Sequence, residues 1–193
     1  PSLCSRASWA RSGRGWCGGS NVLRVRLEPF AEDHLPALDA LIADPVTVRF
    51  TRIPEPTPPG FPRLWLDMYE KGRRDGTREA FAALDDDGTF LGLALAPEID
   101  RDAREVELGY MVAPDARGRG VATAMLRALT TWAFEQGALR AALIINADNP
   151  ASERVAARCG YLREGVMRSI HLKGAQRVDA TLWSRLPSDP DGA

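Results

Sequence analysis

The stretch Val112-Ala-Pro-Asp-Ala-Arg117-Gly118-Arg119-Gly120-Val121-Ala122-Thr123 joins a strand-like apolar alternation to the clearest helical pattern of the chain. Gly118 and Gly120 leave backbone N–H groups uncovered by side chains at the point where that helix begins. A helix N-terminus with open N–H groups and a favourable dipole binds phosphate, and Arg117 and Arg119 can add positive charge. The stretch therefore predicts a phosphate or pyrophosphate site. A glycine-rich turn with solvent-facing arginines is the alternative.

Two other phosphate-binding loops fit this stretch less well. The chain contains no Gly-Lys-[Ser/Thr] sequence, which excludes a nucleoside-triphosphate P-loop on the motif. Gly118-Arg-Gly120 lacks the third glycine or alanine of a dinucleotide-binding turn, and no acidic residue follows about twenty positions on at the end of a strand. The residues thus indicate pyrophosphate without identifying its carrier.

Periodicity on both sides of this stretch predicts one mixed α/β (α+β) domain, with a mostly antiparallel central sheet flanked by helices. The Pro-rich stretch Ile53–Pro62 must be a loop, and Asp85-Asp-Asp-Gly88 marks a hairpin turn. The expected helices are Ala31–Ala43, Phe61–Gly72, Val121–Gln136 and Ala151–Cys159. The expected strands are Val22–Leu27, Glu79–Leu84, Phe90–Ala96, Arg104–Val112, Leu139–Ile145, Gly165–Leu172 and Arg177–Leu186.

Composition narrows the class of protein. The chain has 193 residues, 45% of them hydrophobic, and a net charge of −1, which suggests neither nucleic acid nor a membrane as a partner. Three scattered cysteines predict neither a disulfide framework nor a metal site, so we expect a cytoplasmic protein with Cys159 buried. Residues 1–21 read as a flexible extension, with an ordered arm or a targeting segment as alternatives, residues 22–186 as the domain, and residues 187–193 as a flexible tail.

Four short blocks, in order along the chain, resemble one family. Arg117-x-x-Gly120-x-Ala122 is similar to the [Gln/Arg]-x-x-Gly-x-[Gly/Ala] pattern of the GNAT superfamily of N-acetyltransferases. The other blocks are Glu107-Leu-Gly109-Tyr110, Asn146-x-x-Asn149-x-x-Ser152 with Arg158-Cys-Gly160-Tyr161, and Val178-Asp-Ala180. They resemble the branch that acetylates N-terminal alanines of ribosomal proteins. The resemblance covers residues 22–186.

The resemblance implies that acetyl-CoA is the acetyl donor and that no metal is needed. Its pyrophosphate would lie on the turn formed by Arg117, Gly118, Arg119, Gly120, Val121, Ala122 and Thr123. Met111 and Val112 would pair with the pantetheine arm like an added strand, and the Val112 N–H would polarise the thioester carbonyl. Asn146 or Asn149 would hydrogen-bond the pantetheine, with N-capping as the alternative for Asn149. Arg158 would reach the phosphates, or lie on a solvated helix face.

The catalytic candidates are Glu107, Glu105 and Ser152. The resemblance places Ser152 near the cofactor sulfur, where it can protonate the leaving thiolate. Ala156 stands where many members of the superfamily carry a tyrosine acid. Glu107 matches the family's glutamate as a base or amine anchor, and Glu105 shares its strand face, with arginine salt bridges as the alternative. Among the histidines, His171 is a minor candidate and His34 is expected at the surface.

The resemblance implies that the acceptor is a primary amine, either a protein N-terminus or a small molecule such as an aminoglycoside, polyamine or amino acid. The Pro-rich loop, the helix bearing Trp65 and Tyr69, and residues Lys173–Gln176 are expected to select it. A non-catalytic acyl-CoA-binding sensor is the alternative from another class, and a homodimer is a possible assembly.

Overall fold

A seven-stranded sheet forms the centre of the protein, which we describe from a computed structural model for residues 24–192. The strand order is β1-β2-β3-β4-β5-β7-β6, and every neighbouring pair is antiparallel except β4 and β5, which are parallel. The strands are β1 (Arg26–Pro29), β2 (Glu79–Leu84), β3 (Phe90–Asp100), β4 (Glu105–Val112), β5 (Arg140–Asn146), β6 (Leu162–Lys173) and β7 (Gln176–Arg185). The α-helices are α1 (Leu35–Ala43), α2 (Pro45–Phe50), α3 (Phe61–Asp75), α4 (Val121–Glu135) and α5 (Pro150–Arg158).

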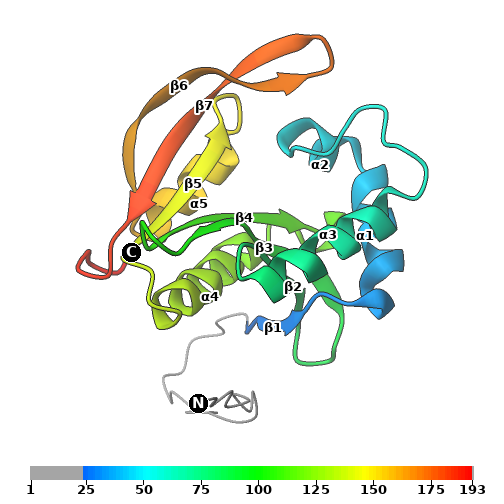
Figure 1. Ribbon diagram of the computed structural model, residues 1–193, viewed down its shortest axis with the longest axis horizontal. Helices are drawn as coiled ribbons and strands as arrows, with labels where there is room; N and C mark the ends of the chain where they lie inside the picture. The colour runs from blue at the N-terminus through cyan, green and yellow to red at the C-terminus, as the bar shows by residue number, and fades with distance from the viewer. Residues whose placement is uncertain (1–23, 193) are drawn as a thin grey trace, which may run out of the picture.

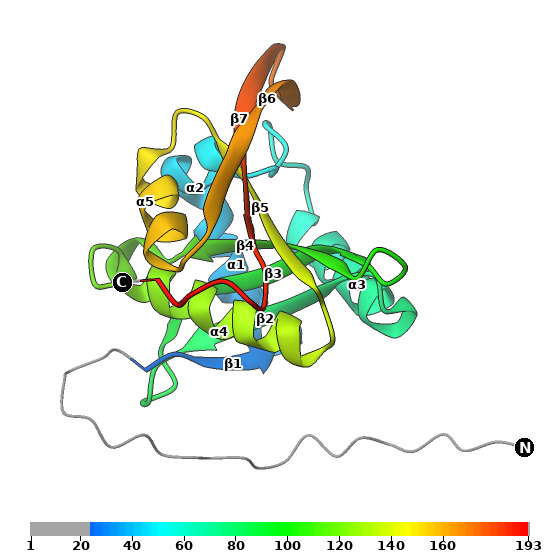
Figure 2. The same ribbon diagram turned by 90° about the vertical axis from the view of Figure 1, so that its left-hand side faces the viewer.

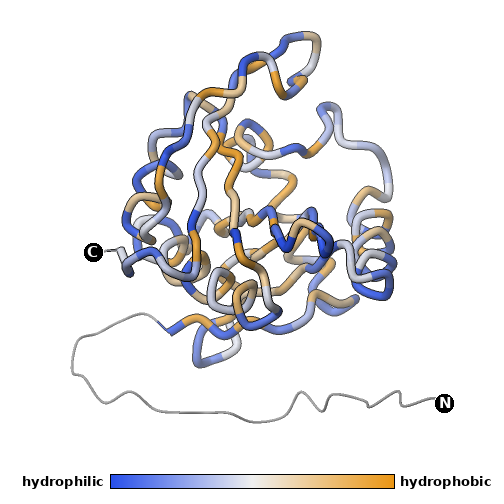
Figure 3. Tube along the Cα trace, turned by 60° about the vertical axis from the view of Figure 1, so that its left-hand side comes forward, coloured by the Kyte–Doolittle hydropathy of each residue, from blue (hydrophilic) through white to orange (hydrophobic). Residues whose placement is uncertain are grey.

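Helices cover both faces of the sheet, so two cores form (Figures 1 and 2). On one face, α4 packs Met125, Leu126 and Leu129, all 0% exposed, against inward-facing strand residues. On the other face, α1 and α3 pack against Leu93 and Met111. Hydrophobic residues concentrate in the strands, while α3 and α5 mix hydrophobic with hydrophilic positions, as expected for helices with one buried side (Figure 3).

Helix α4 and the β2–β3 hairpin form where the sequence predicts them. The buried residues of α4 recur at spacings of three and four along its 15 residues. In the hairpin, Asp85 accepts the N–H groups of Asp87 (3.0 Å) and Thr89 (2.8 Å), and Gly88 adopts a φ of +82°. A left-handed φ of this kind favours glycine because it has no Cβ.

The structure adds one helix and corrects three local expectations. Helix α1 ends at Ala43 before Asp44-Pro45, as predicted, but Asp44 also caps a further helix, α2, which begins at Pro45, since proline suits a first helical turn. His34, expected at the surface, has a side chain only 13% exposed, and its Nδ1 accepts the N–H of Ala31. The first strand spans Arg26–Pro29, and residues 1–21 lie outside the described part of the chain.

The third correction concerns the C-terminal end. Residues 187–192, predicted as a tail, turn back against the end of α5. Arg185 pairs there with Asp191 (2.5 Å), and a Cβ on Gly192 would lie 2.1 Å from the carbonyl oxygen of Arg158. No helix among residues 24–192 is long and apolar enough to cross a membrane.

Candidate active site

The two parallel strands of the sheet separate part-way along their length. β4 and β5 are paired only at Glu105–Arg140, Val106–Ala141 and Glu107–Ala142. Beyond Glu107, β4 stays on β3 while β5 stays on β7, so a gap opens within the sheet. A cleft of about 710 Å³ occupies this region, and residues of β4, β5, α3 and the β6–β7 hairpin line it.

Alternation along β4 decides which backbone groups face the gap. Ala113 donates its N–H to the Leu91 carbonyl of β3 (2.9 Å), and adjacent residues of a strand point to opposite sides. The N–H of Val112 therefore turns from β3 toward the gap, whereas Met111 pairs with Leu93 of β3. Of these two predicted residues, Val112 offers a backbone donor, and Met111 contributes a side chain to the cleft wall.

The N-terminus of α4 presents backbone N–H groups without a side-chain cap. Its N-cap is Gly120, and the first α-type backbone bond runs from the Ala124 N–H to the Gly120 carbonyl (3.1 Å), leaving the N–H groups of Val121, Ala122 and Thr123 outside the helical ladder. Gly118 and Gly120 have φ values of +73° and +82°, and a Cβ at either would meet nothing within 4 Å. The turn is therefore open, and its backbone conformation favours glycine.

The two arginines of the turn have different environments. Arg119 is exposed, and none of the residues 24–192 forms an ion pair with it, so it can serve an anion. Arg117 instead points inward: its guanidinium pairs with Asp44, contacts the Thr47 hydroxyl (3.0 Å) and donates to the Val112 carbonyl (3.3 Å). The Arg117 side chain thus ties the turn to α2. The same pair lowers the pKa of Asp44 to about 2.

Helix α5 holds Ser152 at the cleft through two hydrogen bonds. Asn149 caps the helix by accepting the Ser152 N–H (3.2 Å), and its Nδ2 donates to the Ser152 hydroxyl (3.3 Å). The Tyr110 hydroxyl of β4 also donates to Ser152 Oγ (3.1 Å). Because Ser152 Oγ accepts twice, its own proton remains available for a third group. Burial raises the pKa of Tyr110 to about 12, which keeps the phenol protonated.

Of two further residues predicted to bind the cofactor, Asn146 lies in the cleft and Arg158 lies outside it. Asn146 lines the cleft, and its Nδ2 donates to the Arg49 carbonyl of α2 (3.4 Å). Arg158 is exposed at the last residue of α5, and its carbonyl accepts from Arg127 (3.2 Å). Arg127 lies seven residues into α4, roughly 10 Å from that helix's N-terminus at 1.5 Å per residue. This placement favours the solvated-face interpretation of Arg158.

Of the two glutamates of β4, only Glu107 lines the cleft. Glu107 lines the cleft with a side chain 14% exposed, and it pairs with Arg52, the residue just before the Pro-rich loop. Burial raises the pKa of Glu107, and the charge of Arg52 opposes this rise. Glu105 lies outside the cleft and pairs with Arg140 of β5 (3.1 Å).

These features accompany a clear family match. The family described as "Acetyltransferase (GNAT) domain" matches residues 24–162, more than half of the chain. The chain belongs to the GNAT family. This confirms the resemblance found in the sequence and the single α/β domain that it implied.

Known relatives of this GNAT chain differ in the acceptors that their names give. The chain is 33% identical over 107 residues to the putative ribosomal N-acetyltransferase YdaF of Bacillus subtilis. This match covers 55% of this chain and 58% of that protein, which is little more than half of the relative. It is 31% identical over 166 residues to a phosphinothricin N-acetyltransferase of Alcaligenes faecalis, covering 80% and 78% of the two chains.

A solved structure supports the fold. The RimL ribosomal L7/L12 alpha-N-protein acetyltransferase, solved in complex with coenzyme A, superposes with a TM-score of 0.77 at 21% identity, covering 84% of this chain and 94% of that one.

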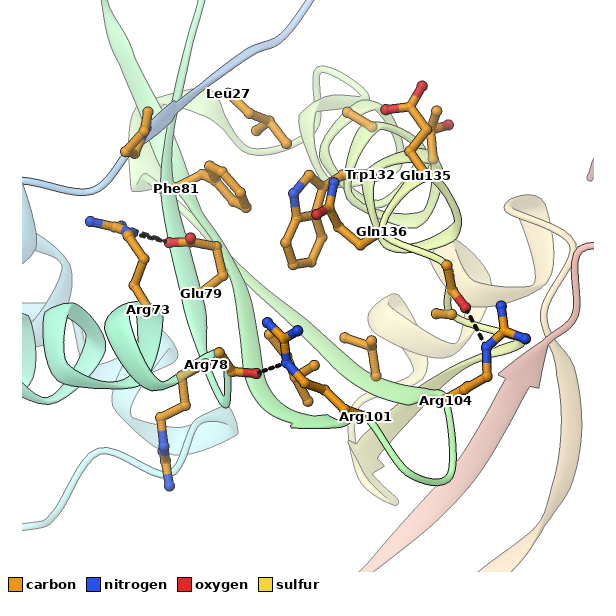
Figure 4. Close-up of a pocket in the computed structure, with 18 of the residues that line it drawn as sticks. Leu27, Arg73, Arg78, Glu79, Phe81, Arg101, Arg104, Trp132, Glu135 and Gln136 are labelled. Carbon is orange, nitrogen blue, oxygen red and sulfur yellow. Dashed lines mark hydrogen bonds and ion pairs between the residues drawn. The ribbon is translucent and has the colours of Figure 1, made fainter. Parts of the chain in front are cut away.

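The GNAT domain has a second, larger cavity away from the β4–β5 gap. It measures about 1110 Å³ and lies between α4, the β3–β4 connection and the start of the described chain. Trp132 and Phe81 meet edge-to-face over it, 5.3 Å between ring centroids, and Arg101 and Arg104 are held at its rim by carbonyls of Gly76 and Gly137 (Figure 4). None of the catalytic candidates lines it. Within residues 24–192, no group of three or more His, Cys, Asp or Glu residues could hold a metal ion.

Sequence reasoning missed two members of the GNAT site. Tyr110 belongs to the Glu107–Tyr110 motif but has no predicted role, and Arg52 belongs to none of the four motifs. Each acts on a candidate far away in the sequence: Tyr110 on Ser152, 42 residues on, and Arg52 on Glu107, 55 residues on. The alternation of β4 could have indicated a role for Tyr110. Side chains two residues apart lie on the same face of a strand, so Tyr110 lies on the same face as Val112.

Proposed function

We propose that this GNAT chain transfers the acetyl group of acetyl-CoA to a primary amine by direct attack within a ternary complex. The observation that carries the proposal is the gap between β4 and β5. The uncapped N-terminus of α4 lies just beyond the end of β4, and the Ser152 hydroxyl and the Glu107 carboxylate face the cleft that this gap opens.

The residues present fit acetyl-CoA. Backbone N–H groups of Gly118 to Thr123 would receive the pyrophosphate, with Arg119 adding charge. The Val112 N–H would bind the carbonyl of the acetyl group, in the manner of an oxyanion-hole donor. Acetyl-CoA supplies a thioester whose acetyl carbon can be attacked by an amine.

Glu107 would remove the proton of the acceptor ammonium, directly or through water. Burial raises its pKa, and a raised carboxyl pKa makes a carboxylate a better base near neutral pH. As the new C–N bond forms and the C–S bond breaks, Ser152 would donate its proton to the departing sulfur and recover the second proton released by the amine nitrogen, so that it ends as a hydroxyl. Tyr110 and Asn149 orient the hydroxyl for this step, because both donate to its oxygen.

We infer that the acceptor is either a protein N-terminus or a small-molecule amine. The match to a putative ribosomal N-acetyltransferase supports the first, and the longer match to a phosphinothricin N-acetyltransferase supports the second. We also propose a cytoplasmic location from the low cysteine content, and a homodimer, which light scattering of the purified protein would test.

The substitution Glu107→Gln tests the catalytic proposal against that of an acyl-CoA-binding sensor. The variant should keep its thermal stabilisation by acetyl-CoA and lose at least about tenfold in thiol release. Glu105→Gln is the matched control, since Glu105 is on the same strand and outside the cleft. Acetyl-CoA binding without thiol release by the wild type, across peptides and small amines, would favour the sensor.

A further inference from the structure

The cleft assigned to the acceptor is lined by more cations than carboxylates. Arg52, Arg78 and Lys173 contribute positive charge, and Glu107 is the single acidic residue among the described residues that line it. Glu98 lies close enough to affect the pKa of Glu107, and Glu55 close enough to affect the pKa of Lys173, but neither lines the cleft. His171 adds an imidazole whose pKa is lowered, first by burial.

Two of the three cations already have partners. Arg52 forms an ion pair with Glu107. The Lys173 ammonium donates to the carbonyls of Val48 (2.7 Å) and Thr51, and so fastens the β6–β7 hairpin to the end of α2.

Arg78 has no such partner. No carboxylate within residues 24–192 forms an ion pair with it, and the one hydrogen-bond contact of its guanidinium there is the Met68 sulfur, at 3.7 Å. A thioether is only a weak acceptor. Among the three cations, Arg78 is therefore the one whose charged group is held by neither a carboxylate nor a backbone carbonyl of the described residues.

The fold directs the Arg78 guanidinium toward the cleft. Gly72 of α3 makes room for its stem, because a Cβ at that position would lie 2.5 Å from Arg78 Cβ. Arg78 also lines the second cavity, but in Figure 4 its guanidinium points away from Arg101 and Trp132 there. Burial raises the pKa values of Tyr69 and Glu107, and the positive charges of Arg78 and Arg52 partly oppose this rise. Both arginines thus lie near the proposed base.

We propose that the acceptor of this enzyme carries a negatively charged group, such as a carboxylate, close to its amine, and that Arg78 binds this group. The inference rests on the function proposed above. An arginine fork binds a carboxylate through charge-assisted hydrogen bonds. A polyamine would bring several positive charges into a cleft whose lining already holds an excess of cations.

The test compares acceptors that differ in one charge. The acceptors are the C-terminally amidated peptides Ser-Glu-Ala-Ala, Ser-Gln-Ala-Ala and Ser-Lys-Ala-Ala, alanine with alaninamide, and spermidine, each with saturating acetyl-CoA. We expect the anionic member to have kcat/KM higher by about tenfold or more in at least one of the two series. Preference among the peptides would identify a protein N-terminus as the source of the anion, and preference for alanine over alaninamide would identify a free amino acid.

Variants assign the preference to Arg78. Arg78→Gln should abolish it, Arg78→Lys should restore part of it, and Arg74→Gln, an exposed arginine of α3, should leave it intact. Stabilisation by coenzyme A would verify that each variant is folded. If no acceptor reacts, binding of the same compounds to the coenzyme A-loaded protein decides. The proposal would be overturned by equal kcat/KM for charged and neutral acceptors, by a higher kcat/KM for spermidine, or by a preference for anionic acceptors that remains in Arg78→Gln. Activity with neutral amines would leave the proposed function standing.

Discussion

The substitution Gly120→Asp probes the proposed pyrophosphate site. Gly120 has a φ of +82°, and a Cβ there meets nothing within 4 Å, so the new side chain fits without a clash. The left-handed backbone costs an ordinary residue roughly 1–2 kcal/mol, and aspartate tolerates it better than most. The variant should therefore fold with a modestly reduced Tm.

The loss of coenzyme A affinity should be larger than this strain. A unit charge at ~6 Å from another costs roughly 3 kcal/mol at an effective dielectric constant of about 20. Salt at physiological strength, with a Debye length of about 8 Å, reduces this by about half. For a pyrophosphate with two charges, about 2–3 kcal/mol remains, which corresponds to a loss of affinity on the order of 50-fold.

Isothermal titration calorimetry with coenzyme A measures this loss, and the chain contains a matched control. Gly88, in the β2–β3 turn, has the same φ of +82° and the same open surroundings. Gly88→Asp should lower Tm to a similar extent and leave affinity unchanged, while Gly120→Asn should lose less affinity than Gly120→Asp. Equal affinities for Gly120→Asp and Gly88→Asp would refute the assignment of phosphate to the α4 turn.

Three further predictions concern other parts of the site and the core. Tyr110→Phe removes a donor to Ser152 and should lower kcat about five- to tenfold with coenzyme A affinity unchanged; loss of affinity instead would mean that Tyr110 shapes the binding site. Asp44→Ala should cost about 1–3 kcal/mol in urea unfolding, and Asp44→Asn less, because asparagine keeps the cap of α2 while losing the ion pair to Arg117. The folded-state pKa of Asp44 is lowered from 3.8 to about 2, so the stability that its carboxylate contributes is present above pH 4 and lost as pH falls toward 2. Over that range the free energy of unfolding of the wild type should fall more than that of Asp44→Asn. Parallel plots of unfolding free energy against pH would contradict this. Leu129→Ala, at a position 0% exposed in the core under α4, should cost about 2–5 kcal/mol, and a change below 1 kcal/mol would contradict the packing described.

Local signals predicted most of the fold. The spacing of buried residues in α4 and the Asp85–Gly88 turn are both encoded within a few residues, and both elements were predicted with nearly the observed bounds. The short helix α2 was not predicted. Asp44-Pro45 ends α1, as predicted, and also begins α2, where Asp44 accepts the Thr47 N–H and pairs with Arg117, 73 residues away.

The site was predictable where the backbone makes it, and less so where side chains meet across the fold. Gly118 and Gly120 indicate an open helix N-terminus by themselves. By contrast, the spacing of Glu105 and Glu107 on one strand face suggested similar roles, yet pairing with Arg140 removes the first from the cleft and pairing with Arg52 keeps the second within it. Such long-range pairing has no signature in a single sequence.

A crystal structure of the protein with coenzyme A would test the central claim most directly. The account predicts the pyrophosphate on the N–H groups of Gly118 to Thr123, the pantetheine in the gap between β4 and β5, and the sulfur beside the Ser152 hydroxyl. Coenzyme A bound instead in the cavity beside Trp132, or with its sulfur remote from both Ser152 and Glu107, would contradict it.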